Sequence, residues 1–513
     1  MEVIHTASLV LDPAYLIGPV PRRLFGTFVE HMGRCVYTGL YEPEHPRAGT
    51  FGLREDVLEL TREIGPTVVR YPGGNFVSNY RWEDGVGPHS ERPTRLDLAW
   101  HSLETNQFGL HEFADWASQV GSEIMLAVNL GTRGLREACD LLEYANHRSG
   151  TYWSDRRIAN GAHDPFDIKL WCLGNEMDGP WQVGHKTAYE YGRLANETGK
   201  AMRLIDSEIE LVACGSSNSG MPTFGSWEST VLEQCYETVD YVSLHAYYEE
   251  LDGDAPSFLA SAIDMDRFIE SVIATSDAVG AKLKSRKRLN LSFDEWNVWY
   301  TRRFAGDGPQ PRDTPWLQHP RLIEDDYTIT DAVVVGTLLN SLLRHADRVT
   351  VACQAQLINV IGLLRSEPGG DAWKQTIAYP FEQMRRLARG NILGVIAQSD
   401  RYDSASYTDV PLVDATGTYD DETGKVALFV ATRSLTESVE LSVDLRSMRT
   451  ARVLGSSTLH ARADQDRHAS NGVTHDAVAP QPFDAYTVSD GQLTATLPPL
   501  SWTVFEISTR GVG

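Results

Sequence analysis

The sequence Ile168-Lys-Leu-Trp-Cys-Leu-Gly-Asn-Glu176 is a short apolar run that ends in a carboxylate, and Leu289-Asn-Leu-Ser-Phe-Asp-Glu295 repeats this arrangement. Neither run alternates strictly between apolar and polar residues, which is typical of parallel strands that are covered on both faces. Segments with apolar residues at helical spacing, such as 191–202 and 338–343, lie between runs of this kind. Short strands that alternate with helices predict β-α units around a parallel sheet.

Eight such strands are expected between residues 19 and 384. They are Leu24–Val29, Thr67–Tyr71, Glu123–Asn129, Ile168–Leu173, Glu210–Cys214, Tyr241–His245, Leu289–Phe293 and Arg348–Cys353. Eight β-α units in a segment of this length predict an α/β fold, a (β/α)₈ TIM barrel.

The pattern of apolar and polar residues changes over residues 385–513. Leu441, Val443 and Leu445 alternate with polar residues, which is the period-two pattern of half-buried antiparallel strands. We therefore expect a C-terminal all-β sandwich, jelly-roll-like, whose final strand lies in Leu497–Ile507. Residues 1–18 precede the first barrel strand, and we expect them to add a strand to this sandwich.

Composition excludes several classes of function. The net charge of -24 would repel a nucleic-acid backbone, so nucleic acid is not an expected partner. The most apolar stretch, residues 332–343, is too short to span a membrane, and the first residues lack the basic region of a signal peptide. The six cysteines are scattered without a CxxC pair, which favours reduced thiols in a cytoplasmic protein.

Polar side chains gather where the predicted barrel strands end, and active sites of such barrels form at that face. Glu176 and Glu295 follow the fourth and seventh strands and would face each other across the mouth. Most glutamates are solvated surface charges, but a pair in this position can divide the work of glycosidic cleavage. One carboxylate stays ionised as nucleophile, while its charge keeps the other protonated as acid.

Other chemistries fit the sequence less well. His111-Glu112 lacks the second histidine of a zinc motif, and the 215–220 segment does not match a serine-hydrolase elbow, so no cofactor is expected. His31, His245 and His345 could gather around a metal, but we favour hydrogen-bonding roles and predict no metal site. Tryptophans near the strand ends could stack on sugars, and among them Trp299 is favoured for the site while Trp296 is expected to pack inward.

At this point the motifs resemble those of glycoside hydrolase family 51, the intracellular α-L-arabinofuranosidases of clan A. The resemblance spans essentially the whole chain. The segments that carry it are Phe25-Gly-Thr-Phe-Val-Glu-His31, Arg70-Tyr-Pro-Gly-Gly-Asn-Phe76, Trp171-Cys-Leu-Gly-Asn-Glu-Met177, Ser243-Leu-His-Ala-Tyr-Tyr248, Asp294-Glu-Trp-Asn-Val-Trp-Tyr300 and Ala355-Gln-Leu-Ile-Asn-Val360.

The resemblance implies an exo-acting, retaining enzyme that releases arabinofuranosyl units from arabinan, arabinoxylan or derived oligosaccharides. It implies that Glu176 is the acid/base, Glu295 the nucleophile, and that His245 tunes both carboxylates. It also implies a homo-oligomer, a hexamer. The remaining implied substrate contacts are Glu30, Asn75, Trp100, Asn175, Tyr247, Trp299 and Gln356, whereas Gln354 departs from the family pattern and is doubtful as a contact.

Alternatives stay open on the residues alone. The carboxylate pair is shared with other clan A retaining enzymes, so a β-xylosidase or β-glucanase is the nearest rival. A catalytically silent sugar-binding protein and a metal-dependent hydrolase are more distant ones. The linkage preference and the choice between polymer and oligosaccharide cannot be read from the sequence.

Overall fold

The computed structural model describes residues 5–307, 314–448, 450–473 and 478–510. Its centre is a closed barrel of eight strands, each parallel to its neighbours, so the expected (β/α)₈ barrel is confirmed. In chain order the strands are β3 (Arg23–Phe28), β4 (Val68–Tyr71), β7 (Glu123–Val128), β8 (Leu170–Leu173), β9 (Glu210–Ala213), β10 (Tyr241–Tyr248), β11 (Asn290–Val298) and β12 (Val349–Gln354).

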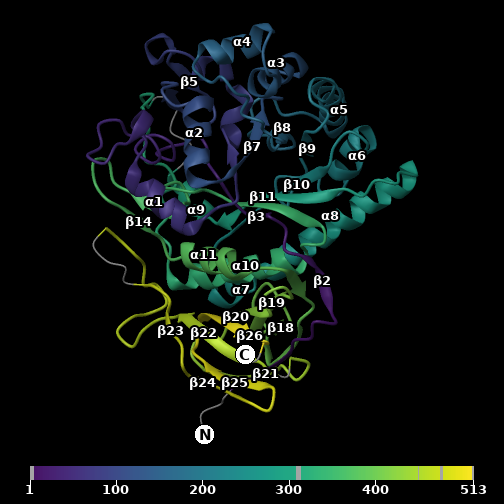
Figure 1. The fold of residues 1–513 in the computed structure, drawn as a ribbon, viewed down its shortest axis with the longest axis vertical. Coiled ribbons are helices and arrows are strands. Elements are labelled where there is room, and N and C mark those ends of the chain that lie inside the picture. Colours follow the sequence, from purple (N-terminus) through teal and green to yellow (C-terminus); the bar gives the residue numbers. More distant parts are fainter. Residues whose placement is uncertain (1–4, 308–313, 449, 474–477, 511–513) are drawn as a thin grey trace.

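Helices surround the barrel, and their buried faces follow the apolar spacing of the sequence (Figure 1). They are α1 (Glu55–Ile64), α2 (Leu110–Val120), α3 (Leu135–Asn146), α4 (Tyr152–Ala159), α5 (Ala188–Ile205), α6 (Ser226–Cys235), α7 (Ala255–Leu259), α8 (Ser261–Leu283), α9 (Thr301–Asp307), α10 (Ile329–Arg344) and α11 (Ala378–Leu387). No helix in the described ranges is long and apolar enough to cross a membrane.

Two barrel strands run further than the sequence predicts. The expected end of one strand was His245, yet β10 continues to Tyr248, and β11 continues beyond the expected Phe293 to Val298. The sequence does not predict these extensions, because strands are predicted from runs of apolar residues and the residues at the barrel mouth are polar. Register shifts accompany the polar stretch, in the pairing of β10 with β11 and in the pairing of β11 with β12.

Short strands decorate the barrel mouth. β5 (Arg95–Asp97) and β6 (Ser102–Glu104) form a hairpin after β4, and β13 (Leu364–Ser366) pairs with β14 (Ala372–Lys374) after β12. The hairpin carries Trp100 in its turn, so this tryptophan reaches the mouth from outside the barrel sheet.

A sandwich of two sheets packs below the barrel (Figure 1). One sheet has the order β16-β1-β21-β25-β24 and the other β2-β15-β19-β20-β26-β22-β23. The strands are β1 (His5–Val10), β2 (Leu16–Pro19), β15 (Asn391–Leu393), β16 (Ile396–Ser399), β19 (Val413–Asp420), β20 (Lys425–Thr432), β21 (Val439–Asp444), β22 (Arg452–Leu459), β23 (Gln481–Pro482), β24 (Tyr486–Ser489), β25 (Gln492–Leu497) and β26 (Ser501–Ser508), with a separate small pair β17 (Arg401–Tyr402) and β18 (Val410–Pro411).

Helices α10 and α11 lie between the barrel and the sandwich (Figure 1). Trp502 of β26 is fully buried there, and its indole Nε1 donates a hydrogen bond to Gln383 Oε1 of α11 at 3.0 Å. A Cβ atom at Gly336 of α10 would lie 2.4 Å from the Trp502 ring, so only glycine permits this close approach. The described barrel and sandwich are therefore joined through a packed core.

Candidate active site

The two candidate catalytic carboxylates meet at the C-terminal mouth of the barrel. Glu295 lies within β11, and Glu176 follows β8 by three residues. One carboxylate oxygen of each residue and a ring nitrogen of His245 lie within 4.8 Å of one another. Retaining glycosidases hold their carboxyl groups about 5–5.5 Å apart, whereas inverting enzymes need about 6.5–9.5 Å to admit a water molecule. The observed spacing suits direct attack by one carboxylate.

The backbone at Glu176 is unusual. Gly174 has φ 92° and Glu176 has φ 43°, so the chain turns sharply where β8 ends. A left-handed conformation is uncommon for a residue with a side chain, and such residues concentrate at functional sites. The turn aims the Glu176 carboxyl across the mouth toward β10 and β11.

His245 of β10 is buried between three carboxyl groups. Its Nδ1 lies 2.9 Å from Glu176 Oε1, and its Nε2 lies 2.9 Å from Asp294 Oδ1. Glu295 Oε2 is 3.7 Å from the same Nδ1. Burial by itself lowers the pKa of His245, but the charge of Glu295 and the hydrogen bonds to Asp294 and Glu176 outweigh it and raise the pKa to about 10. At neutral pH both ring nitrogens therefore donate.

Glu295 is held from two sides. Arg70 Nη1 donates to Glu295 Oε1 at 2.6 Å, and the Tyr247 hydroxyl donates to Glu295 Oε2 at 2.8 Å. Arg70 also donates from Nη2 to Asn175 Oδ1 at 2.7 Å, and only 1% of its surface is exposed. The hydrogen bond from the Arg70 guanidinium to Glu295 is charge-assisted, so it orients the Glu295 carboxylate as well as stabilising it.

Glu176 has a different environment. Burial raises its pKa most, the neighbouring charge of Glu295 raises it further, and hydrogen bonds from His245 and Trp181 oppose the shift. The Trp181 indole Nε1 donates to Glu176 Oε2 at 2.7 Å. The net direction is upward, which is the direction that a general acid requires.

Glu30 forms a second polar centre in the same mouth. Its Oε1 accepts hydrogen bonds from the Phe76 backbone N–H and from Trp100 Nε1, both at 2.9 Å, and Gln356 Nε2 lies 3.4 Å from its Oε2. Burial, and then the charges of Glu295 and Asp97, raise the pKa of Glu30 to about 8 against the effect of its two N–H donors. This carboxyl group is poised to exchange hydrogen bonds with a polar ligand.

The structure also brings the remaining predicted contacts to this region. Asn175 Nδ2 lies 3.4 Å from Asn75 Oδ1, and the Trp299 ring meets the Tyr247 ring edge to face at 5.0 Å between centroids. Trp296, in contrast, is fully buried, as expected for a side chain that packs inward. The Gln354 side chain is buried and donates to Asn297 Oδ1 at 3.0 Å.

The three histidines that the sequence offered as metal ligands do not gather. His31 lies 2.9 Å from Glu104 Oε2 and 2.8 Å from the Tyr71 hydroxyl, and His345 lies against the carbonyl of Ser341 at 3.0 Å. Among the described residues, the group that could hold an ion consists of Glu176, His245 and Glu295 themselves.

Sequence reasoning left three site residues without a role. Arg70 and Asp294 belong to the motifs at strand ends, and their charge at the barrel mouth is a signal from which a role in the site could have been predicted. Trp181 gave a weaker one, because it lies in the loop after β8 and 49% of its surface is exposed. Its position only five residues after Glu176 was the available hint.

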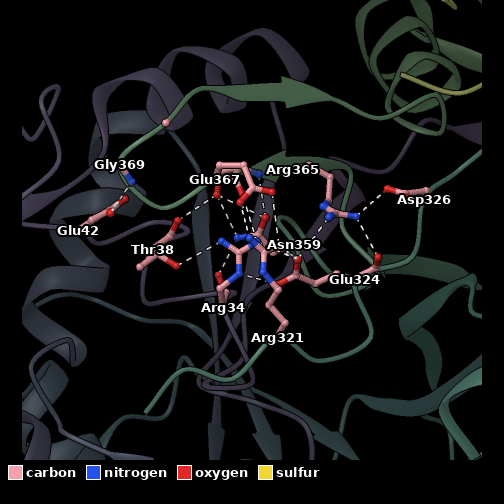
Figure 2. A network of polar contacts seen from close by, with 12 residues as sticks. Arg34, Thr38, Glu42, Arg321, Glu324, Asp326, Asn359, Arg365, Glu367 and Gly369 are labelled. Atoms are coloured by element: carbon pink, nitrogen blue, oxygen red, sulfur yellow. Dashed lines mark hydrogen bonds and ion pairs between the residues drawn. The ribbon is translucent and has the colours of Figure 1, made fainter. Parts of the chain in front are cut away.

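A polar network, with the buried ion pair of Arg34 and Glu324 at its centre, fixes the loops behind the mouth (Figure 2). Arg34 donates from Nε and Nη2 to Glu324 Oε1 and Oε2 at 2.6 and 2.8 Å. Asn359 donates to the Arg34 carbonyl at 2.9 Å, and the Ile361 N–H donates to the Ile323 carbonyl at 2.9 Å. The network thus ties the segment before α10 to the loop after β12, and that loop carries Gln356.

The segment before α10 in turn supports the β5–β6 hairpin. The Leu103 N–H donates to the Leu317 carbonyl at 2.9 Å, and the centroids of the His101 and Trp316 rings lie 3.9 Å apart. This hairpin holds Trp100 against Glu30. One wall of the mouth therefore depends on contacts between segments that are more than 200 residues apart.

Comparisons with known proteins agree over nearly the whole chain. Residues 60–261 match the family model of the α-L-arabinofuranosidase 1 domain, and residues 294–501 match that of the α-L-arabinofuranosidase C-terminal domain. An intracellular exo-α-(1→5)-L-arabinofuranosidase from Streptomyces lividans is 56% identical over 97% of this chain and 75% of its own length. One of the same name from Halalkalibacterium halodurans is 50% identical over 98% of this chain and 99% of its own.

A solved structure gives the same result. The family 51 α-L-arabinofuranosidase from Bifidobacterium longum superposes with a TM-score of 0.93 at 46% identity, and the match covers 98% of this chain and 100% of that one. The likeness includes both the barrel and the sandwich.

Proposed function

The chain belongs to the α-L-arabinofuranosidases of glycoside hydrolase family 51, and on this premise we propose that it releases terminal α-L-arabinofuranosyl residues by double displacement, with Glu295 as nucleophile and Glu176 as acid/base. The observation that carries the proposal is the spacing of the two carboxylates, within 4.8 Å, at a mouth where His245 contacts both. The barrel, residues 19–384, would carry the reaction, and residues 385–513 would form the sandwich unit with the N-terminal strand.

In the first step a Glu295 oxygen attacks the anomeric carbon, and the bond from that carbon to the leaving-group oxygen breaks. Glu176 gives its proton to the departing oxygen. Arg70 and Tyr247 hold the attacking carboxylate from its two oxygens, which leaves the lone pairs that face the sugar available. Glu30, Asn75, Asn175 and Gln356 supply hydrogen-bonding groups for the sugar hydroxyls.

In the second step Glu176 removes a proton from water, and the water oxygen attacks the anomeric carbon. The bond to Glu295 breaks, and the product keeps the configuration of the substrate. The exchange of roles by Glu176 is favoured because the ester of Glu295 carries no charge. One of the influences that raise the pKa of Glu176 is then absent.

The experiment that tests these roles uses Glu176→Ala with azide. An aryl arabinofuranoside with a good leaving group should still form the covalent intermediate, whereas hydrolysis of unactivated substrates should fall by about 10²–10⁴-fold without general acid catalysis. Azide needs no deprotonation, so it should restore turnover and give an α-configured arabinofuranosyl azide.

Glu295→Ala should give the inverted azide, because azide then replaces the missing nucleophile. Glu190→Ala is a matched control: this exposed glutamate lies in the first turn of α5, the helix after β8, and should keep full activity with no response to azide. If NMR shows the two azide configurations exchanged between the variants, the roles of Glu176 and Glu295 are reversed.

The relatives from Streptomyces lividans and Halalkalibacterium halodurans are both named as intracellular enzymes that act on α-(1→5) linkages. We therefore propose that this chain also acts inside the cell and prefers α-(1→5)-linked arabino-oligosaccharides over arabinoxylan fragments. Equal rates on both substrates would refute the preference. A panel of nitrophenyl glycosides separates the proposed activity from that of a β-xylosidase or β-glucanase.

The assembly state is also a proposal. We expect a homo-oligomer, a hexamer, and expect neither nucleic acid nor a membrane as a partner of a chain with a net charge of -24. Sedimentation of the full chain would measure the assembly directly, and a monomer at micromolar concentration would refute it.

A further inference from the structure

Three arginines line a cavity on the face of the barrel opposite to the candidate active site. The cavity has a volume of about 350 Å³, and Arg22, Arg385 and Arg389 are among its lining residues. Arg22 directly precedes β3, and the lining residues Thr67 and Gly121 precede β4 and β7. These positions are the N-terminal ends of barrel strands, whereas the catalytic carboxylates lie at the C-terminal ends.

The cluster lacks acidic partners. Within the ranges that the structure describes, no carboxylate lies within 4.0 Å of a guanidinium nitrogen of Arg22, Arg385 or Arg389. The chain contains 70 acidic residues and 46 Lys and Arg residues, so acidic partners are abundant elsewhere. Three cations that line one cavity without a counter-charge repel one another, and an anion that fills the space between them would relieve this repulsion.

Most of the guanidinium donors remain available. Arg385 donates from Nε to the Gly65 carbonyl at 2.8 Å, and Arg389 donates from Nη1 to the carbonyls of Arg385 and Ala388 at 2.8 Å. The terminal nitrogens of Arg385 have no hydrogen-bond acceptor among the described residues, and neither has any guanidinium nitrogen of Arg22. Guanidinium groups present their N–H donors in a planar fork that matches the oxygens of a phosphate.

The charges on these arginines act on one another. The pKa of Arg385 is lowered first by burial and then by the positive charges of Arg389 and Arg22. Burial and the two neighbouring positive charges therefore disfavour the charged form of Arg385, and no acidic group in the described ranges offsets this effect. Val20, Pro21 and Ala388 form an apolar part of the lining, while Arg22 and Arg389 are exposed and can be reached by a ligand from solvent.

We propose that this cavity binds a phosphate group, either as inorganic phosphate or as the phosphate of a small sugar monoester. The volume admits either ligand, and the three cations match a doubly charged anion. The site is separate from the reaction at the barrel mouth and does not rest on the proposed function.

Isothermal titration calorimetry on the full chain tests the proposal, with inorganic phosphate and ribose 5-phosphate as probes and sodium chloride at matched ionic strength as the reference. Saturable binding is expected for at least one phosphate probe, and the tighter one identifies the source. Arg22→Gln should weaken it about tenfold or more, because a charge-assisted hydrogen bond is lost.

Arg22 makes no hydrogen bond or ion pair with the described residues, so its replacement should leave folding intact. Arg386→Gln is the matched control, because Arg386 is exposed on α11 next to Arg385 but does not line the cavity. It should bind phosphate like the unchanged chain. Arabinofuranosidase activity should stay the same in both variants, since the mouth is on the opposite face.

Two results would overturn the proposal. One is a titration with phosphate that does not differ from the chloride reference. The other is equal phosphate affinity in Arg22→Gln and the unchanged chain. If Arg22→Gln instead alters the sedimenting mass while phosphate fails to bind, the cluster contacts an acidic surface of another copy, and the phosphate site is wrong.

Discussion

Replacement of Arg34 by methionine tests whether the buried network behind the mouth holds the surrounding loops closed (Figure 2). The Arg34 side chain is 3% exposed and its partner Glu324 is 7% exposed. Loss of Arg34 removes two hydrogen bonds to Glu324, one to the Ser366 carbonyl at 3.0 Å and one to the Thr38 hydroxyl at 3.4 Å. Methionine keeps much of the apolar volume, so the change isolates the charge.

The magnitude follows from burial. Removal of one partner from a buried ion pair costs about 3–5 kcal/mol, because the other charge stays behind in the interior. Arg321 Nη1 at 2.9 Å and Arg365 Nη2 at 3.3 Å still contact Glu324, which places the expected loss at the lower end, about 3 kcal/mol. This energy corresponds to roughly a 100-fold increase in the opened population of the segment before α10.

Amide hydrogen exchange followed by mass spectrometry measures this opening. The Ile361 and Leu103 amides donate to carbonyls of that segment, so peptides that contain them should exchange roughly 100-fold faster in Arg34→Met. The temperature of thermal inactivation should fall as well. Exchange in the sandwich, for example around Val443 of β21, should not change.

Arg321→Met provides the control within the same network. Its side chain is 52% exposed and its contacts are with Glu324 and with Glu367, which is 36% exposed. Exposed pairs contribute about 0–1 kcal/mol, so exchange should accelerate by at most about fivefold. If Arg321→Met has the larger effect, or Arg34→Met has none, burial of the network does not determine its strength.

Three further predictions concern the site itself. Trp181→Phe removes a hydrogen-bond donor to the ionised form of Glu176, so the pKa of Glu176 should rise. The basic limb of the pH profile of kcat/KM should then move to higher pH. A shift to lower pH would contradict the role of Trp181 as a donor to Glu176. The pKa of His245 is raised to about 10, so its protonation stabilises the fold fully below about pH 6.5 and the contribution is lost as the pH rises toward 10. The unfolding temperature of His245→Gln should therefore lie furthest below that of the unchanged chain at pH 6, and a gap that widens toward pH 10 would oppose the reasoning. Dialysis against EDTA should leave activity unchanged, and restoration of lost activity by a divalent ion would show a metal-dependent hydrolase.

The barrel could be predicted because each strand combines a short apolar run with a polar end. This signal located every barrel strand to within a few residues at its start. It failed at the ends of β10 and β11, where His245 and Glu295 are polar yet remain in strand pairing. Register at a barrel mouth is set by neighbouring strands, and a single sequence does not display those neighbours.

Without the resemblance, the candidate site could be predicted only where its residues stand in strand-end motifs. Trp100 contacts Glu30 across 70 positions, and Arg34 contacts Glu324 across 290, so nothing local in the sequence announces either contact. The resemblance supplied Trp100, and it supplied neither Arg34 nor Trp181. Loops that meet only in the folded chain carry no periodicity from which their contacts can be inferred.

The charges at the centre of the mouth explain why the two glutamates differ although both are buried. Arg70 and His245 bring two positive charges, and Asp294, Glu295 and Glu176 bring three carboxyl groups. One proton shared among the carboxyl groups makes the cluster neutral. Arg70 contacts Glu295 directly and Asp294 at 3.9 Å, whereas Glu176 has no contact with it in the described structure and has a raised pKa. The proton therefore belongs on Glu176 in the free enzyme. In the proposed mechanism, formation of an ester at Glu295 would remove one negative charge, and neutrality of the cluster would then favour ionised Glu176, the form proposed to activate water.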